Sequence, residues 1–160
     1  MNQQRRRRLN GTPLHHPIYD EVQQTLQQEA ALGNTIKVCI GTDSQVKGQQ
    51  TCFATVIVFV RQGKGAFMYV KQFATFKRMS IKERMLAEVA SSIEVAYHLC
   101  HLFIASNVAM EVHADINTQP RFKSHQAFKE AMGYINGMGF DFKAKPHAFA
   151  SSACANKLVQ

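Results

Sequence analysis

The most constraining feature of the sequence is a short apolar stretch that ends in a carboxylate, Lys37-Val38-Cys39-Ile40-Gly41-Thr42-Asp43-Ser44. Its side chains alternate in character with a period of two, which predicts a β-strand over residues 35–42. A carboxylate at the end of a central strand is held rigidly and remains open to solvent, a placement that suits a metal ligand. Asp and Ser are also ordinary turn residues, so Asp43 could equally cap a turn before Gly48.

The rest of the chain predicts further strands and helices in a regular order. The expected elements are a helix over 17–31; strands over 35–42, 51–61 and 66–76; a helix over 80–104; a strand over 108–115; a helix over 121–136; a strand over 140–145; and a last helix, capped by Ser151 or Ser152, that runs to about residue 159. Tight glycine turns join the first three strands, which predicts an antiparallel meander. The order predicts an α/β fold with a five-stranded mixed sheet flanked by helices.

Length and charge set the domain organisation. A chain of 160 residues predicts one domain. We expect residues 1–16 to form a flexible basic arm without fixed structure, followed by a single domain over 17–160 with an extra N-terminal helix. The net charge is +8 and the pI is near 9.5, and four of the positive charges lie in Arg5–Arg8. Such a charge favours a nucleic-acid partner, although a solvated tail would explain the arginine run equally well.

Hydropathy and cysteine usage predict the compartment. No apolar run approaches the roughly 20 residues of a membrane span, and no apolar stretch follows the arginines as it would in a secretory signal. The four cysteines are far apart and include no C-x-x-C pair, so we expect reduced thiols rather than disulfides or a zinc site. The simplest expected location is the cytoplasm, away from the membrane.

Two further carboxylates stand at positions that are unusual for surface acids. Glu88 falls on an apolar face of the long predicted helix, between Met85 and Ser92. A buried carboxylate needs a cation or a hydrogen-bonding network, unless it lies near enough to the helix start to reach solvent. Asp115 ends the strand over 108–115, so it repeats the pattern of a strand that runs out into an acid.

These acids and this order of elements resemble the ribonuclease H-like superfamily, and within it the YkuK-like, ribonuclease H-related group of bacterial proteins. The resemblance covers residues 35–159. It is carried by Gly41-Thr42-Asp43-Ser44, Leu86-Ala87-Glu88-Val89-Ala90, Ala114-Asp115-Ile116-Asn117 and the tail over residues 149–157. It implies that Asp43 is the first-strand acid, Glu88 the helix acid and Asp115 the fourth-strand acid of a metal site.

The resemblance also implies two roles near the end of the chain. Ribonuclease H-like enzymes usually carry a fourth acid in the last helix, and Asn156 stands in the matching place. An amide keeps an oxygen ligand but loses the charge, which puts a second metal in doubt; an ordinary surface residue is an equally good interpretation. His147 corresponds to a mobile histidine thought to assist proton transfer or product release, although a loop histidine can also be simply exposed.

The implied chemistry is metal-dependent cleavage of a phosphodiester in RNA or an RNA–DNA hybrid. Oxygen ligands of this kind favour Mg²⁺ or Mn²⁺, and two such ions ~3.5–4 Å apart would activate water and stabilise the leaving oxygen. The phosphate backbone would be held by basic residues near the site, or these would be ordinary surface cations. The candidates are Lys47, Lys71, Lys77, Arg78, Arg121 and Lys123.

Two other functions fit the same resemblance. One is a nucleic-acid-binding module of this fold whose site is weak or inactive, which Asn156 and the basic arm favour. The other is a nucleotide-binding protein related to sugar kinases and actin. Proteins of that kind use two such domains around a cleft, and 160 residues have room for one.

Overall fold

The structure is a computed structural model that describes residues 5–116, 125–137 and 139–160. Its elements are β1 (Arg5–Arg8), α1 (Ile18–Ala31), β2 (Ile36–Lys47), β3 (Gln50–Arg61), β4 (Gly65–Thr75), α2 (Ile81–Ala105), β5 (Ala109–Ala114), α3 (His125–Gly137), β6 (Asp141–Lys143), the π-helix η1 (Ala150–Ala155) and α4 (Asn156–Val159). Within the described residues, no helix combines the length and the apolar character that crossing a bilayer requires.

The strands form one mixed sheet in the order β1-β4-β3-β2-β5-β6. Strands β2, β3 and β4 are the predicted antiparallel meander. Strand β5 pairs in parallel with β2, and β6 pairs in parallel with β5. Helix α2 connects β4 to β5 and α3 connects β5 to β6, so each new strand starts again from the same edge of the sheet. The predicted α/β fold with a mixed sheet is therefore confirmed, with six strands in place of the expected five.

The sixth strand corrects the expectation of an unstructured arm. Residues Arg5–Arg8 form β1, which pairs antiparallel with the edge strand β4. The exposed backbone groups of β4 provide hydrogen-bond partners for an incoming strand. The arginine side chains also find partners, since Arg7 donates to Oε1 of Gln72 at 3.1 Å and Arg8 lies over the Tyr69 ring. These contacts hold a charged run that composition alone predicts to be solvated.

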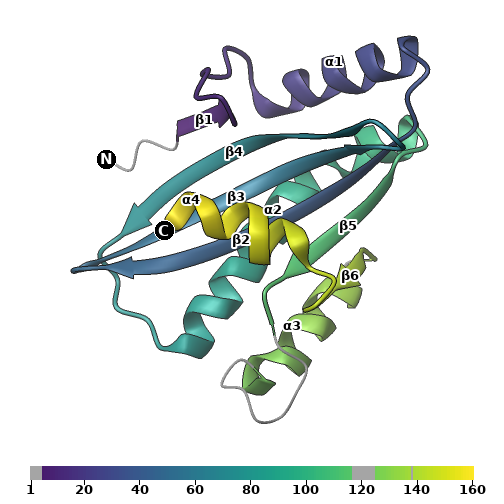
Figure 1. The fold of residues 1–160 in the computed structure, drawn as a ribbon. Coiled ribbons are helices and arrows are strands. Elements are labelled where there is room, and N and C mark those ends of the chain that lie inside the picture. The colour runs from purple at the N-terminus through teal and green to yellow at the C-terminus, as the bar shows by residue number, and fades with distance from the viewer. Residues whose placement is uncertain (1–4, 117–124, 138) are drawn as a thin grey trace.

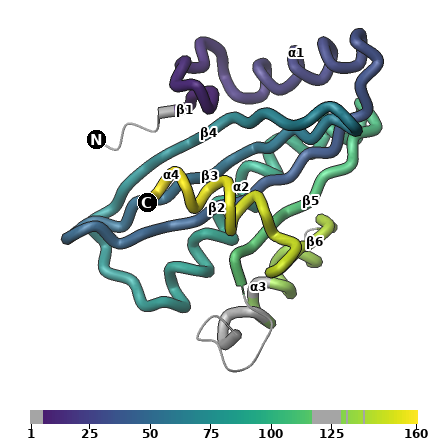
Figure 2. Tube along the Cα trace, in the orientation of Figure 1, coloured from purple at the N-terminus to yellow at the C-terminus, as the bar shows by residue number. Residues whose placement is uncertain are grey.

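Helices cover the two faces of the sheet unequally (Figures 1 and 2). One face packs against α1 and α2 in the larger core, which includes Val38, Ile40, Leu99 and Phe103. The other face carries the C-terminal segment formed by η1 and α4, over a smaller core around Cys39, Val56, Val58, Val70, Ala150 and Ala155. Strand β2 lies between these two layers and contacts both of them.

The two predicted helix caps have different outcomes. At the start of α2 the capping box is confirmed, because Oγ of Ser80 accepts from Glu83 N at 3.1 Å and Glu83 Oε2 accepts from Ser80 N at 2.7 Å. The prediction that Ser151 or Ser152 caps the last helix is wrong. Both hydroxyls donate to Ala148 O instead, and the segment begins with a wide π-turn before it becomes α-helical.

The C-terminal segment approaches β2 most closely at Gly41. A Cβ atom at Gly41 would lie 2.5 Å from Ser151 N and 2.6 Å from Ala150 C, which are backbone atoms that cannot rotate away. The backbone of Gly41 itself does not require glycine, because it lies in the extended conformation of β2. The missing side chain is therefore what lets the segment pack onto β2, the strand that carries Asp43.

We predict that Gly41→Ala destabilises the protein by about 1–3 kcal/mol, because the added methyl forces the C-terminal segment away from the sheet. The free energy of unfolding from urea denaturation measures this loss. Gly133→Ala in α3 is the matched control, since a Cβ atom there meets nothing within 4 Å and alanine favours a helix. Equal stability of the Gly41→Ala variant and the wild type would refute the packing argument.

Candidate metal centre at the strand ends

The prediction that the first strand ends at Asp43 is wrong, because β2 continues to Lys47 and Asp43 pairs with Ala54 of β3 within it, whereas Asp115 directly follows β5. Thr42 of β2 pairs with Ala114 of β5, and each acid follows directly after its residue of that pair. Asp115 Oδ1 lies 2.7 Å from Lys145 Nζ, yet this buried oxygen accepts no hydrogen bond of good geometry. The carboxylate of Asp115 is therefore ion-paired with Lys145, and a cation bound to Oδ1 would have to displace that ammonium.

Asp43 is only 7% exposed and is held by two hydrogen bonds. Its Oδ1 accepts from the backbone N–H of Ser44 at 2.9 Å, and its Oδ2 accepts from Nδ2 of Asn156 at 2.7 Å. The amide of Asn156 is oriented by Gln160, whose Nε2 donates to Asn156 Oδ1 at 2.6 Å. The C-terminal segment therefore reaches Asp43 through the residue that stands in place of the fourth acid.

Glu88 comes to the same region from α2 and is 7% exposed. The hydroxyl of Ser44 donates to its Oε1, and Arg84 Nε lies 4.0 Å from the same oxygen. Burial raises the pKa of Glu88 to about 8, and the charge of Asp43 adds to the increase, whereas the Ser44 hydroxyl and Arg84 oppose it. The sequence-based expectation of a buried acid on an apolar helix face matches this placement.

Asp43 and Glu88 both contact Ser44, whereas Asp115 contacts Lys145. Glu88 favours its protonated form, Asp115 lies beside Lys145, and Asp43 accepts from Asn156. Carboxylate and amide oxygens are the donors that Mg²⁺ and Mn²⁺ prefer. The donor types therefore fit such a cation, although among the described residues the three acids do not form a group of ligand atoms that are close to one another.

The remaining predicted site residues lie on several different elements of the fold. His147 is exposed in the turn before η1, and Lys77 and Arg78 are exposed in the segment that leads into α2. Lys47 ends β2, where its Nζ donates to Gln160 O at 2.8 Å. Arg121 and Lys123 lie outside the described residues.

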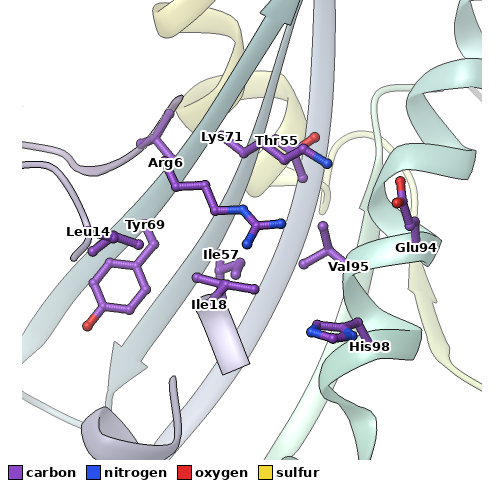
Figure 3. A pocket seen from close by; sticks show the side chains of 11 residues that line it. Arg6, Leu14, Ile18, Thr55, Ile57, Tyr69, Lys71, Glu94, Val95 and His98 are labelled. Carbon is purple, nitrogen blue, oxygen red and sulfur yellow. The ribbon is translucent and has the colours of Figure 1, made fainter. Parts of the chain in front are cut away.

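Lys71 is placed elsewhere, in a cavity of about 260 Å³ on the α2 face of the sheet (Figure 3). It lies on β4, and β3 separates it from β2 and the acids. Arg6 extends its guanidinium into this cavity, and Glu94 and His98 of α2 stand across from it. The structure does not bring Lys71 to Asp43 and Asp115.

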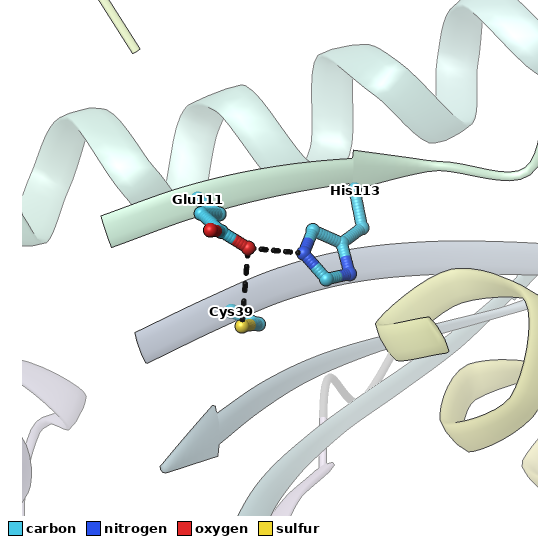
Figure 4. Close-up of side chains that lie close together, drawn as sticks. All are labelled: Cys39, Glu111 and His113. Atoms are coloured by element: carbon cyan, nitrogen blue, oxygen red, sulfur yellow. Dashed lines mark hydrogen bonds and ion pairs between the residues drawn. The ribbon is translucent and has the colours of Figure 1, made fainter. Parts of the chain in front are cut away.

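A second cluster of potential ligands was not predicted as a site. Cys39, Glu111 and His113 have ligand atoms that all lie within 4.8 Å of one another (Figure 4), and among the described residues no other such trio is this close. The alternation of side chains along β2 and β5 already puts Cys39 on the face of Asp43, and Glu111 and His113 on the face of Asp115. The missing information was the register, which pairs Cys39 with Glu111 and Gly41 with His113.

Comparison with known proteins identifies the family. A family model described as ribonuclease H-like matches residues 17–160. The chain belongs to the ribonuclease H-like family. The uncharacterized protein YkuK of Bacillus subtilis (strain 168) is 31% identical over 135 residues, which cover 76% of this chain and 77% of YkuK. No solved structure matches the chain significantly. Membership fixes the fold class and leaves the activity open, because one fold hosts many functions.

We predict that stability falls as the pH rises from about 4.5 to about 8, because Glu88 stays protonated in the folded protein while the unfolded chain releases its proton. Below this window Glu88 is protonated in both the folded and the unfolded state, so it no longer makes the stability depend on pH. Without divalent ions, the free energy of unfolding of the wild type should decline by on the order of a few kcal/mol across this window, and Glu88→Gln should remove that decline. Urea denaturation at several pH values measures it.

Glu94→Gln is the matched control on the same helix, because Glu94 is exposed. It should leave the pH dependence of the wild type unchanged. A Glu88→Gln variant that declines with pH as steeply as the wild type would contradict the assigned burial cost.

Proposed function

We propose that this protein is a metal-dependent nuclease that hydrolyses phosphodiester bonds in RNA or an RNA–DNA hybrid. The observation that carries the proposal is that acids from three separate segments of a ribonuclease H-like fold lie on or beside the paired strands β2 and β5. Glu88 is bonded to the residue next to Asp43, and Asp115 follows the strand paired with that of Asp43. Burying carboxylates together is costly without a cation, so the arrangement favours a site built to hold one.

In this proposal Asp43, Glu88 and Asp115 would hold Mg²⁺ or Mn²⁺. Asn156 offers a neutral amide oxygen, which requires its side chain to turn from the orientation in which Nδ2 donates to Asp43. When held by these residues, such an ion would supply an activated water and would stabilise charge on the phosphate. His147, exposed in the turn before η1, is assigned to proton transfer or product release.

Charge supports a nucleic-acid substrate. The chain carries a net charge of +8, and Lys77 and Arg78 are exposed just before the helix that carries Glu88. Cations at such positions would hold phosphates, with Lys47 at the end of β2 and Arg121 and Lys123 as further candidates. A cytoplasmic location, where thiols stay reduced, fits the four free cysteines.

A second function, nucleic-acid binding without cleavage, is favoured by one specific observation. Asp43 is nearly buried and bonded to an asparagine where ribonuclease H-like enzymes usually carry an acid. Loss of that charge weakens a second cation site. Incubation with Mg²⁺ or Mn²⁺ and labelled RNA, hybrid or DNA distinguishes the two functions, because binding without cleavage of any substrate would favour the second.

We predict that Asp43→Asn abolishes both cleavage and the rise in melting temperature that Mn²⁺ gives the wild type. The amide removes the charge that attracts the cation and keeps the size of the side chain. Cleavage of labelled hybrid and thermal unfolding with and without Mn²⁺ measure the two effects.

The matched control is Asp141→Asn, which changes the same group on an exposed residue of β6. It should retain both cleavage and stabilisation by Mn²⁺. An Asp43→Asn variant that is still stabilised by Mn²⁺ as strongly as the wild type would refute the metal site.

A further inference from the structure

Strands β2 and β5 carry a buried chain of polar side chains beneath the start of the C-terminal segment. Cys39 is fully buried, His113 is 1% exposed, and Glu111 lies between them (Figure 4). Glu111 Oε2 is 3.0 Å from His113 Nε2 and 3.8 Å from Cys39 Sγ, and its Oε1 is 3.4 Å from Lys37 Nζ. Every group around Glu111 is thus a potential donor to its carboxylate.

The hydrogen bonds assign one tautomer to His113. The backbone N–H of Ala150 donates to Nδ1 at 3.2 Å, so Nδ1 is the acceptor and carries no proton. The proton of the neutral ring then lies on Nε2, which faces Glu111. An ionised carboxylate can only accept, so Glu111 fixes the proton on Nε2 and leaves Nδ1 free for Ala150.

We propose that His113 is a positioning residue of the candidate nuclease site, held by Glu111 in the tautomer that accepts the first backbone N–H of the C-terminal segment. This inference rests on the proposed function. Ala150 opens η1, and the same segment carries Asn156 to Asp43. The hydrogen bond from Ala150 to His113 holds the start of the segment over the sheet, where His113 pairs with Gly41. The His113 ring also makes a T-shaped contact with the Phe149 ring.

The position of this contact explains how it acts on Asp43. Ala150 and Ser151 pack directly on Gly41, two residues before Asp43 on the same strand face. The far end of the segment is attached separately, since Gln72 Nε2 donates to Leu158 O at 2.9 Å. His113 therefore sets where the segment starts, and a shift of that start would move Asn156 away from Asp43 Oδ2.

The same three side chains could be taken for a transition-metal site, but the hydrogen bonds oppose that interpretation. A metal on Nε2 would displace the proton to Nδ1, where the N–H of Ala150 already points. The ammonium of Lys37 lies beside Glu111 and would repel a cation. Burial also raises the pKa of the Cys39 thiol to about 12, which disfavours the thiolate that a metal needs.

The test compares His113→Asn with His113→Gln. Asparagine keeps an oxygen acceptor near the position of Nδ1, whereas glutamine reaches toward Glu111 and leaves Ala150 N–H without an acceptor. Amide hydrogen exchange of residues 150–159, without metal or substrate, should remain within about threefold of wild type in His113→Asn and rise at least tenfold in His113→Gln. With Mn²⁺ and labelled hybrid, kcat should follow the same order while KM stays unchanged.

The two readouts separate the inference from the function on which it rests. Equal exchange in both variants would overturn the positioning role, whether or not the wild type cleaves any substrate. A wild type that cleaves nothing, with the exchange difference intact, would refute the nuclease and leave the docking contact established. Titration with Co²⁺ adds a direct check, and we expect no sulfur-to-cobalt absorption band. A band that Cys39→Ser abolishes would identify Cys39, Glu111 and His113 as a metal site and would overturn the tautomer assignment.

Discussion

Glu88 is buried close to the carboxylate of Asp43, and both its burial and that neighbouring charge disfavour its ionised form. Burial raises the pKa of Glu88, Lys145 lies beside Asp115, and Asn156 donates to Asp43. Protonation removes the charge of Glu88 and Lys145 offsets that of Asp115, whereas Asn156 donates a hydrogen bond to Asp43 and leaves its charge in place. A divalent cation bound by these carboxylates would offset two negative charges, so its binding should stabilise the fold and favour the ionised form of Glu88.

Helix α2 and the C-terminal segment contact β2 from opposite faces of the sheet. Helix α2 delivers Glu88 to Ser44 on one face, and the segment delivers Asn156 to Asp43 on the other. Two features bring the segment close enough, the absent side chain of Gly41 and the acceptor on His113. The alternation of a strand explains how adjacent residues of β2 can take part in both layers.

The sequence alone predicted the features that depend on local periodicity. The phase of α2 put Glu88 on an apolar face, and the alternation of β5 assigned Asp115 to a strand end. The same pattern ended the first strand too early, since β2 continues past Asp43 to Lys47 through its pairing with β3. The sequence could not predict the partners, because Ser44 and Lys145 become neighbours of the acids only through tertiary packing. Strand β1 was missed because the arginine run of residues 5–8 predicts solvation, whereas the pairing depends on the unoccupied edge of β4. Predicting the cluster of Cys39, Glu111 and His113 requires the register of β2 against β5. A shift of one residue in that register would place the side chains of the two strands on opposite faces.

The proposed divalent-cation site depends on Asp43, Glu88 and Asp115 binding one ion together. Anomalous diffraction from crystals grown with Mn²⁺ tests it most directly, because the signal locates the ion without reference to activity. We expect a manganese peak within ligand distance, ~2.0–2.6 Å, of carboxylate oxygens of Asp43, Glu88 and Asp115. A strong peak among Cys39, Glu111 and His113, with none at Asp43, Glu88 and Asp115, would contradict the account.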